Sequence, residues 1–196
     1  MAKRLFASLE EQEEQAKQEL VNTTNNVTSD TPEVIEGEKA SNFSSAIVIS
    51  AMPLLGKTTY CSKHDDSKDL ESSLYSRKQD NSRNEEFPGN YVNMLKYHLV
   101  NNNWKYIFVA SHQVVRDALK ADNIKFYTVY PTRDRKEELL NLARERGNHE
   151  EFIKKLDENW DAWISALEQE SNTYALGPNE FISDEIFDTK LKFLKQ

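Results

Sequence analysis

The chain has 196 residues, of which 38% are hydrophobic, a length that fits one domain with extensions. Acidic residues outnumber basic residues by 33 to 25, and the formal net charge is −8 at pH 7. This excess of negative charge argues against a general affinity for nucleic acid or for an anionic membrane. We therefore expect no nucleic-acid partner and no membrane partner, and a small anionic ligand would need a local basic pocket.

Cysteine usage and hydropathy favour a cytoplasmic protein. Cys61 is the only cysteine, so no internal disulfide can form. No apolar run approaches the roughly 20 residues needed to span a bilayer. Lys3 and Arg4 lead into acidic, glutamine-rich sequence, which differs from the apolar stretch of a secretory signal. A reducing cytoplasm is the expected compartment.

The N-terminal part, residues 1–43, differs in composition from the rest. Four apolar residues recur there at near-helical spacing: Leu5, Leu9, Ala16 and Leu20. The remainder is mostly Asn, Thr, Ser, Glu and Asp, which is linker composition. We predict a polar N-terminal extension that is flexible or weakly helical, attached to one folded domain over residues 44–196. The repeating leucines also permit, but do not require, a helix that mediates oligomerisation or binds a protein partner.

The first predicted strand, residues 46–50, runs into a loop that closes with Gly56-Lys57-Thr58-Thr59. This layout is typical of a phosphate-binding P-loop, whose full pattern is G-x-x-x-x-G-K-[ST]. Backbone N–H groups of such a loop wrap a phosphate, the lysine reaches the β- and γ-phosphates, and the hydroxyl ligates Mg²⁺. The residues expected to bind the phosphates are Pro53, Leu54, Leu55, Gly56, Lys57, Thr58 and Thr59.

The loop departs from the full pattern at two positions. Ala51 replaces the first glycine, and Leu54 stands where a second glycine is usual. The loop therefore has less freedom to adopt positive φ angles. The alternative interpretation is a chance Gly-Lys-Thr on an ordinary strand-to-helix turn.

Strand-like and helix-like segments alternate from residue 46 onward, which is the signature of a parallel α/β sheet. The further predicted strands are residues 67–73, 104–110, 124–130 and, at an edge, 174–176. The predicted helices are residues 89–101, a helix capped by Ser111, and residues 134–146 and 149–169. Together they predict a three-layer α/β P-loop NTPase fold with a parallel sheet of about five strands.

Apolar spacing orients the predicted helices. In the helix after Ser111, the residues expected to face the sheet are Val114, Val115, Ala118 and Leu119. The last helix has a strong apolar face: Phe152, Ile153, Leu156, Trp160, Trp163, Ile164 and Leu167. Both tryptophans are expected in the core. Asn148 and Glu151 have the spacing of a capping box at the start of this helix.

Ligands of open parallel sheets lie beyond the carboxyl ends of the strands, so candidate site residues can be named from the sequence. The catalytic candidates are Lys57, Asp69, Arg144 and Arg146. The candidate substrate contacts are Glu71, Ser72, Ser73, Ser111, His112 and Arg133. The candidate magnesium ligands are Thr58 and Asp69. For His112, the alternative is a polar residue whose hydrogen bonds are satisfied within the fold.

Each candidate residue has a proposed role. Lys57 is interpreted as the phosphate clamp, Thr58 as the magnesium hydroxyl, and Asp69 as a carboxylate that binds magnesium or orients the nucleophile. Arg144 and Arg146 would stabilise the charge of a phosphoryl group in transfer. The alternative for these arginines is a favourable interaction with the helix dipole in the last turn of a helix.

Short motifs along the chain carry a resemblance to a known family. They are Asp69-Leu70-Glu71-Ser72-Ser73, Phe87-Pro88-Gly89-Asn90-Tyr91, Ile107-Phe108-Val109-Ala110-Ser111-His112, Val115-Arg116-Asp117-Ala118-Leu119, Val129-Tyr130-Pro131, Arg146-Gly147 and Asn159-Trp160. In this order they resemble a family of small P-loop proteins encoded by bacteriophages, usually described as adenylate kinase-like or nucleoside monophosphate kinase-like. The likeness spans about residues 46–188.

This resemblance implies a nucleoside monophosphate kinase-like fold, ATP with Mg²⁺, and transfer of the γ-phosphoryl to a nucleotide or similar acceptor. It also implies the cytoplasm of a bacterial host as the location. By the resemblance, the donor phosphates lie at Gly56, Lys57, Thr58 and Thr59, the acceptor near Asp69, Ser72 and Ser73, and the lid region at Arg146.

The chain also departs from the pattern of this family. The family loop is of the G-x-P-G-[ST]-G-K type, whereas Ala51, Leu54 and Leu55 stand here, and Leu142 occupies the place of an expected lid arginine. An arginine at the transferring phosphate can be worth roughly 10³ to 10⁵ in rate. Two functions therefore stay open. One is a nucleotide kinase, and the other is a catalytically weak, nucleotide-binding phage accessory protein that binds a host or viral protein. The net charge and the lack of an aromatic, basic channel disfavour a polynucleotide 5′-kinase.

Overall fold

The computed structural model of the chain describes residues 46–182. The predicted N-terminal arm, residues 1–43, lies outside the described residues, and its role stays a prediction. Within the described part, no helix has the length and the apolar character that crossing a bilayer requires.

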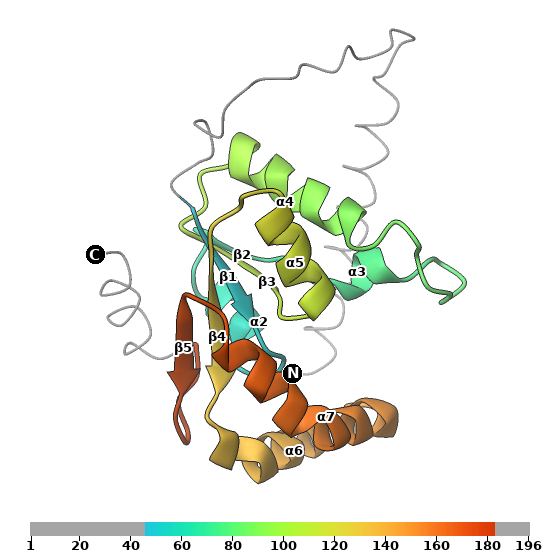
Figure 1. The fold of residues 1–196 in the computed structure, drawn as a ribbon, viewed down its shortest axis with the longest axis vertical. Helices are drawn as coiled ribbons and strands as arrows, with labels where there is room; N and C mark the ends of the chain where they lie inside the picture. Colours follow the sequence, from blue (N-terminus) through green and yellow to red (C-terminus); the bar gives the residue numbers. More distant parts are fainter. Residues whose placement is uncertain (1–45, 183–196) are drawn as a thin grey trace, which may run out of the picture. The chain divides into compact units, whose positions relative to one another are not determined.

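The described residues form an α/β domain around a five-stranded sheet in which every pairing is parallel (Figure 1). The strands are β1 (Ile47–Ala51), β2 (Ser67–Asp69), β3 (Tyr106–Ala110), β4 (Phe126–Pro131) and β5 (Thr173–Leu176). Their order across the sheet is β2-β3-β1-β4-β5, with β1 at the centre. The predicted α/β class and the five-stranded parallel sheet are confirmed, including the edge position of β5.

The helices alternate with these strands. They are α2 (Lys57–Cys61), α3 (Ser73–Ser76), α4 (Gly89–Asn101), α5 (Gln113–Ala121), α6 (Lys136–Glu145) and α7 (Glu150–Glu168), and a short 3₁₀ helix, η1 (Arg133–Arg135), precedes α6. The predicted helix over residues 89–101 is confirmed at both ends. The other long helices differ from their predicted bounds by a few residues, within the usual uncertainty of helix ends.

Helices cover both faces of the sheet. Along β1, Ile47, Ile49 and Ala51 belong to one apolar cluster, which includes buried residues of α2, α6 and α7. Val48 belongs to a second cluster with buried residues of α4 and α5. Successive side chains of a strand point to opposite faces, so the two clusters lie on the two sides of the sheet. This burial on both faces explains why every residue of β1 is buried and four of its five residues are apolar, Ser50 being the exception.

The second strand is shorter than predicted. The sequence predicts a strand over residues 67–73, but β2 ends at Asp69, and Ser73 begins α3. The Ser72 carbonyl accepts hydrogen bonds from the Tyr75 and Ser76 amides, and the Ser73 amide donates to Glu71 Oε1 at 3.1 Å. Acidic and hydroxyl side chains offer such local partners to the backbone, and here they turn the chain away from the sheet.

Both predicted helix caps are wrong. His112, not Ser111, is the N-cap of α5, and the Ser111 carbonyl instead accepts a hydrogen bond from the Arg116 guanidinium. The Asn148 amide donates to the Ala143 carbonyl at 3.0 Å and so closes the C-terminus of α6, which leaves His149 as the N-cap of α7. Gly147, directly before Asn148, has a positive φ of 72°, and a glycine in this conformation commonly ends a helix.

Two residues predicted to face the core lie at the surface. Val114 is 47% exposed and Trp163 is 36% exposed, whereas Val115 and Trp160 are buried. Val114 directly precedes the buried Val115, and Trp163 directly precedes the buried Ile164. Neighbouring residues of a helix point about 100° apart, so a residue next to a buried one can face the solvent. The Trp160 indole N–H also donates to the Arg133 carbonyl at 3.0 Å, and so joins α7 to η1.

The two tryptophans of α7 give a matched test of this packing. Trp160→Phe should lower the free energy of unfolding by about 2 kcal/mol, because it leaves a cavity and an unpaired carbonyl. Trp163→Phe should change it by less than about 0.5 kcal/mol. Urea unfolding followed by circular dichroism measures both values. Equal losses for the two variants would contradict the assigned orientation of α7.

Candidate functional site

Chain topology points to one candidate binding region in the described domain, beyond the carboxyl ends of β1 and β3, where open α/β sheets have their ligand crevice. The helix that follows β1, α2, packs with the first apolar cluster, whereas α5, which follows β3, packs with the second cluster. β1 and β3 are neighbours in the sheet, so the chain leaves their carboxyl ends toward opposite faces. Ligands of open α/β sheets bind at such a switch point. The loop after β1 and the turn after β3 therefore form the walls of the candidate site.

The loop between β1 and α2 has two residues in the left-handed region. Gly56 has φ 95°, and Leu54 has φ 69°. Leu54 thus adopts the positive φ that the sequence made unexpected, at a cost of about 1–2 kcal/mol for a residue with a side chain. Its side chain is only 8% exposed and packs in the first apolar cluster, so burial compensates for the backbone strain. Pro53 is half-buried, and Leu55 is buried beside it.

Lys57 folds back over the end of the central strand. Its ammonium group donates to the Ala51 carbonyl at 3.2 Å and to the Met52 carbonyl at 3.1 Å. Burial lowers the pKa of Lys57, and the negative charges of Asp69 and Glu71 act in the opposite direction. Both contacts are to neutral carbonyls, so within residues 46–182 no carboxylate is bonded to the ammonium.

Thr58 and Asp69 join α2 to the end of β2. The Thr58 hydroxyl donates to Asp69 Oδ2 at 2.7 Å, while Asp69 Oδ1 is buried and has no hydrogen-bond partner in the described part of the chain. Burial raises the pKa of Asp69, which Lys57 and the Thr58 hydrogen bond only partly offset. A buried carboxylate oxygen without a partner is costly, and a bound cation would satisfy it. The next residue of the loop helix, Thr59, is exposed.

These groups fit a magnesium ion that is bound together with phosphates. Among residues 46–182, no three His, Cys, Asp or Glu side chains gather into a metal cluster. Mg²⁺ commonly takes only one or two carboxylates and completes its shell with water and phosphate oxygens. The free Oδ1 of Asp69 and the Thr58 hydroxyl match this limited donor set.

The turn after β3 brings further candidates to the same crevice. Desolvation lowers the pKa of His112, and the positive charge of Lys57 lowers it further, whereas the negative charge of Glu71 acts in the opposite direction. The side chains of Glu71 and Lys57 therefore lie within electrostatic reach of His112. Ser111 is half-buried, Ser72 is buried, and Ser73 and Glu71 are exposed at the start of α3. The structure therefore brings Glu71 and His112 near Lys57, with Ser72, Ser73 and Ser111 as their neighbours in the chain, and the roles of all five stay predictions.

Arg133 points to the last helix rather than into the crevice. Its guanidinium bonds to Asp161 at 3.0 Å and to Glu168 at 2.8 Å, both on α7. The neighbouring Arg135 is buried, pairs with Glu138, and donates to the Glu180 carbonyl at 2.7 Å. Both arginines thus stabilise the contacts of η1 with the surrounding chain in this structure.

Arg144 and Arg146 are exposed at the end of α6. Arg144 donates to the Asn141 side chain at 2.8 Å, and Arg146 is the C-cap residue of the helix. Figure 1 shows α6 and α7 at the end of the sheet toward which the β4 and β5 arrows point. The two helices thus lie at the end of the sheet formed by the carboxyl ends of the strands, which is the end where the candidate site lies. Leu142, one helical turn before Arg146, packs against the first apolar cluster.

The sequence did not reveal two contacts that shape the site. The Ile182 amide donates to the Leu55 carbonyl at 2.8 Å, so the segment after β5 fixes the backbone of the loop. No side-chain pattern could signal this main-chain contact. The Tyr91 hydroxyl contacts both Leu70 and Ala110 at the ends of β2 and β3. The Phe-Pro-Gly-Asn-Tyr motif contains this tyrosine, but nothing in the motif indicated its partners.

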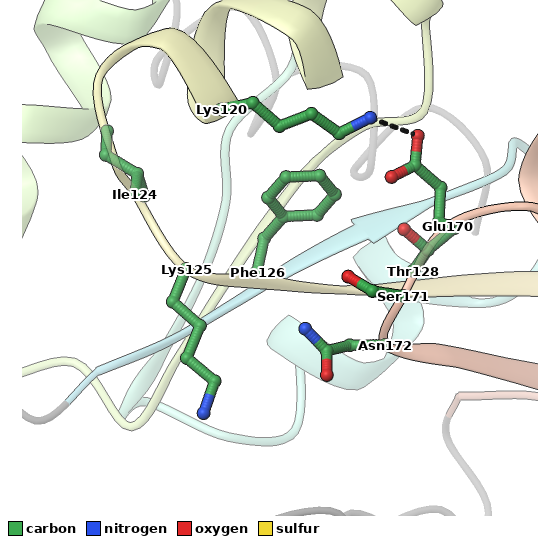
Figure 2. A pocket seen from close by; sticks show the side chains of 8 residues that line it. All are labelled: Lys120, Ile124, Lys125, Phe126, Thr128, Glu170, Ser171 and Asn172. Carbon is green, nitrogen blue, oxygen red and sulfur yellow. Dashed lines mark hydrogen bonds and ion pairs between the residues drawn. The ribbon is translucent and has the colours of Figure 1, made fainter.

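A separate small cavity lies at the opposite ends of the strands (Figure 2). Its volume is about 150 Å³, and its lining residues are Lys120, Ile124, Lys125, Phe126, Thr128, Glu170, Ser171 and Asn172. Figure 2 shows Lys120 reaching Glu170 over the Phe126 ring, an ion pair of 2.8 Å. Small-molecule sites usually measure about 300–1,000 Å³, so this cavity is too small for a nucleotide.

No protein-family model matches the chain, and no curated protein matches it. The candidate site is therefore interpreted from its own geometry and from the motifs in the sequence.

The buried carboxylate of Asp69 leads to a stability prediction. Asp69→Asn should raise the melting temperature of the ligand-free protein, by about 2–4 °C if the buried charge costs about 1 kcal/mol. Because the pKa of Asp69 is raised in the folded protein, ionisation of this carboxyl destabilises the parent as pH rises above the unfolded value of 3.8. The difference in melting temperature between variant and parent should therefore shrink as pH falls toward 3.8.

Calorimetric melting curves between pH 4 and pH 8 would measure this difference. Asp65→Asn is the matched control, because Asp65 is exposed and lies nearby in the chain. A lower melting temperature for Asp69→Asn at neutral pH would show that the carboxylate stabilises the ligand-free fold.

Proposed function

We propose that the chain is a P-loop nucleotide kinase that transfers the γ-phosphoryl of ATP to a nucleoside monophosphate or a similar small acceptor, with Mg²⁺. One observation carries the proposal. At the switch point of the sheet, the Lys57 ammonium lies beside a left-handed loop, and the Thr58 hydroxyl is bonded to a carboxylate with a free buried oxygen. An ammonium, a hydroxyl and a carboxylate in this arrangement are what a magnesium-bound polyphosphate requires.

The donor phosphates would bind at the loop after β1. Among the described residues, the Lys57 ammonium bonds to the neutral carbonyls of Ala51 and Met52, so an incoming phosphate can replace them as its partner. Burial disfavours the charged ammonium, and a phosphate beside it would favour the charged form again. Binding of the phosphate would therefore offset the free-energy cost of desolvating the charged ammonium.

Mg²⁺ would be held by Thr58 and Asp69 together with phosphate oxygens. Bound there, it supplies neutralisation of the negative charge that develops on the phosphates. The Asp69 carboxylate fixes the orientation of the Thr58 hydroxyl through their hydrogen bond.

The acceptor would enter between the start of α3 and the turn after β3. In the transfer, the bond between the γ-phosphorus and the β–γ bridging oxygen breaks, and a new bond forms to an oxygen of the acceptor. ADP leaves with the electron pair, and Lys57 neutralises the charge on the phosphoryl in transfer. A phosphate acceptor is already anionic, so this chemistry needs positioning and charge stabilisation rather than a strong base.

A second function is favoured by the ion pairs of the arginines. Arg133 is held by two acidic residues of α7, and Arg135 is buried against Glu138, so neither is directed to the phosphates. A site with Lys57 as its main cation would bind nucleotide but transfer phosphoryl slowly. This would suit a phage accessory protein that acts on a host or viral protein, with residues 1–43 as the segment that contacts the partner.

Lys57 tests the phosphate site directly. Lys57→Ala should weaken ATP binding by roughly 1.5 to 3 kcal/mol, because it removes a charge-assisted contact. Lys63→Ala is the control, because Lys63 is exposed and lies close to Lys57 in the chain, and this variant should leave the affinity unchanged. Isothermal calorimetry with ATP and Mg²⁺ gives both affinities. An unchanged affinity in Lys57→Ala would rule out this loop as the phosphate site.

A variant of Arg146 distinguishes the kinase function from the accessory function. If the turn after α6 closes over the phosphates during transfer, Arg146→Ala should lower kcat while the dissociation constant of ATP stays nearly the same. Acceptor-dependent formation of ADP measures kcat, and Arg146→Lys should retain part of it. If the parent forms no ADP with any common nucleoside monophosphate, the accessory function takes the place of the kinase.

A further inference from the structure

Tyr91 on α4 has an unusual position at the end of the sheet. Its side chain is fully buried, with 0% exposed. Its hydroxyl donates to the Leu70 carbonyl at 2.6 Å and accepts a hydrogen bond from the Ala110 amide at 3.0 Å. One side chain therefore joins the residue after β2 to the last residue of β3.

The hydroxyl occupies the place of a sheet hydrogen bond. β2 and β3 pair in parallel as far as Asp69 and Phe108, and the Leu70 amide still donates to the Phe108 carbonyl at 2.9 Å. In a parallel ladder, the next bond would run from the Ala110 amide to the Leu70 carbonyl. Those are the two groups that the hydroxyl connects. The hydroxyl thus takes the place of this direct bond and lies between the two strand ends.

The separated strand ends carry the candidate site. Leu70 lies between Asp69 and Glu71, and Ala110 precedes Ser111 and His112. A hydroxyl inserted between the two strands sets the distance between these pairs of side chains. Burial raises the pKa of Tyr91 far above its usual value, so the hydroxyl keeps its proton as a donor to the Leu70 carbonyl.

The same ring anchors the segment between α3 and α4. Tyr75 and Phe87 pack on the Tyr91 ring, with centroids 5.4 Å and 5.8 Å away. The Asn84 and Asn90 side chains both donate to the Tyr75 carbonyl at 3.0 Å. Tyr91 therefore links the segment that borders the crevice to the ends of both strands.

We propose that Tyr91 is a positioning residue whose hydroxyl holds the ends of β2 and β3 apart and so sets the width of the acceptor side of the site. The proposal rests on the proposed kinase function for its effect on turnover. It also assigns a physical role to the Phe-Pro-Gly-Asn-Tyr motif, in which Asn90 holds Tyr75 and Tyr91 holds the strands.

The test is Tyr91→Phe, which keeps the ring contacts and removes only the hydroxyl. Without the hydroxyl, the Ala110 amide and the Leu70 carbonyl should move into a direct hydrogen bond of about 2.9 Å, because buried backbone groups find partners. Narrowing of the crevice should then lower kcat by about tenfold or raise the acceptor KM, while the ATP dissociation constant stays within about twofold. Tyr97→Phe on the same helix is the control, because Tyr97 is exposed and should change neither value.

Crystal structures of parent and variant, together with the kinetics, distinguish the outcomes. If Tyr91→Phe leaves the separation of Leu70 and Ala110 unchanged, the proposal is overturned whatever the activity. If the strands close but kcat and the acceptor KM do not change, the hydroxyl is structural only, and the proposal is equally overturned. If the parent itself forms no ADP with an acceptor, the kinase function fails, and closure of the strands in Tyr91→Phe alone then decides whether Tyr91 sets their spacing.

Discussion

The candidate site depends on one partly buried positive charge, the ammonium group of Lys57 at the end of the central strand. β1 is buried along its whole length, so the loop that follows it starts inside the fold and carries Lys57 with it. Two backbone carbonyls solvate the ammonium, and the charge of Asp69 attracts it across the crevice. Both charged groups pay a desolvation cost in the ligand-free protein. A magnesium-bound phosphate would relieve both costs at once.

The elements that local patterns determine could be predicted from the sequence. The apolar run of β1 and the spacing of Tyr91, Leu95 and Leu99 in α4 follow from burial, and both elements lie where they are expected. The order of strands could not be predicted, because pairing depends on contacts between residues distant in sequence. The end of β2 at Asp69 was also missed, since the turn that follows is fixed by hydrogen bonds within residues 71–76.

The sequence predicted a loop that brings Lys57, Thr58 and Asp69 close together, but it did not predict the partners of Arg133, and the functional roles of these residues stay predictions. Lys57, Thr58 and Asp69 come together because α2 contacts β2, the next element along the chain. Arg133 was expected to contact substrate, yet its partners are Asp161 and Glu168, acidic residues of a helix about 30 positions later. Only the tertiary fold decides which acidic side chain an arginine meets. Leu54 likewise adopts a positive φ because its burial in the core outweighs the local preference of the residue.

Amide chemical shifts in an NMR titration with ATP and Mg²⁺ would test the central claim most directly, because they locate the nucleotide without assuming catalysis. If phosphates bind at the switch point of the sheet, the largest shifts should fall on the amides of Leu55, Gly56 and Lys57, with smaller shifts near Asp69 and Ser111. Shifts confined to the small cavity at the other end of the strands, or no shifts at saturating nucleotide, would contradict a phosphate site at this loop.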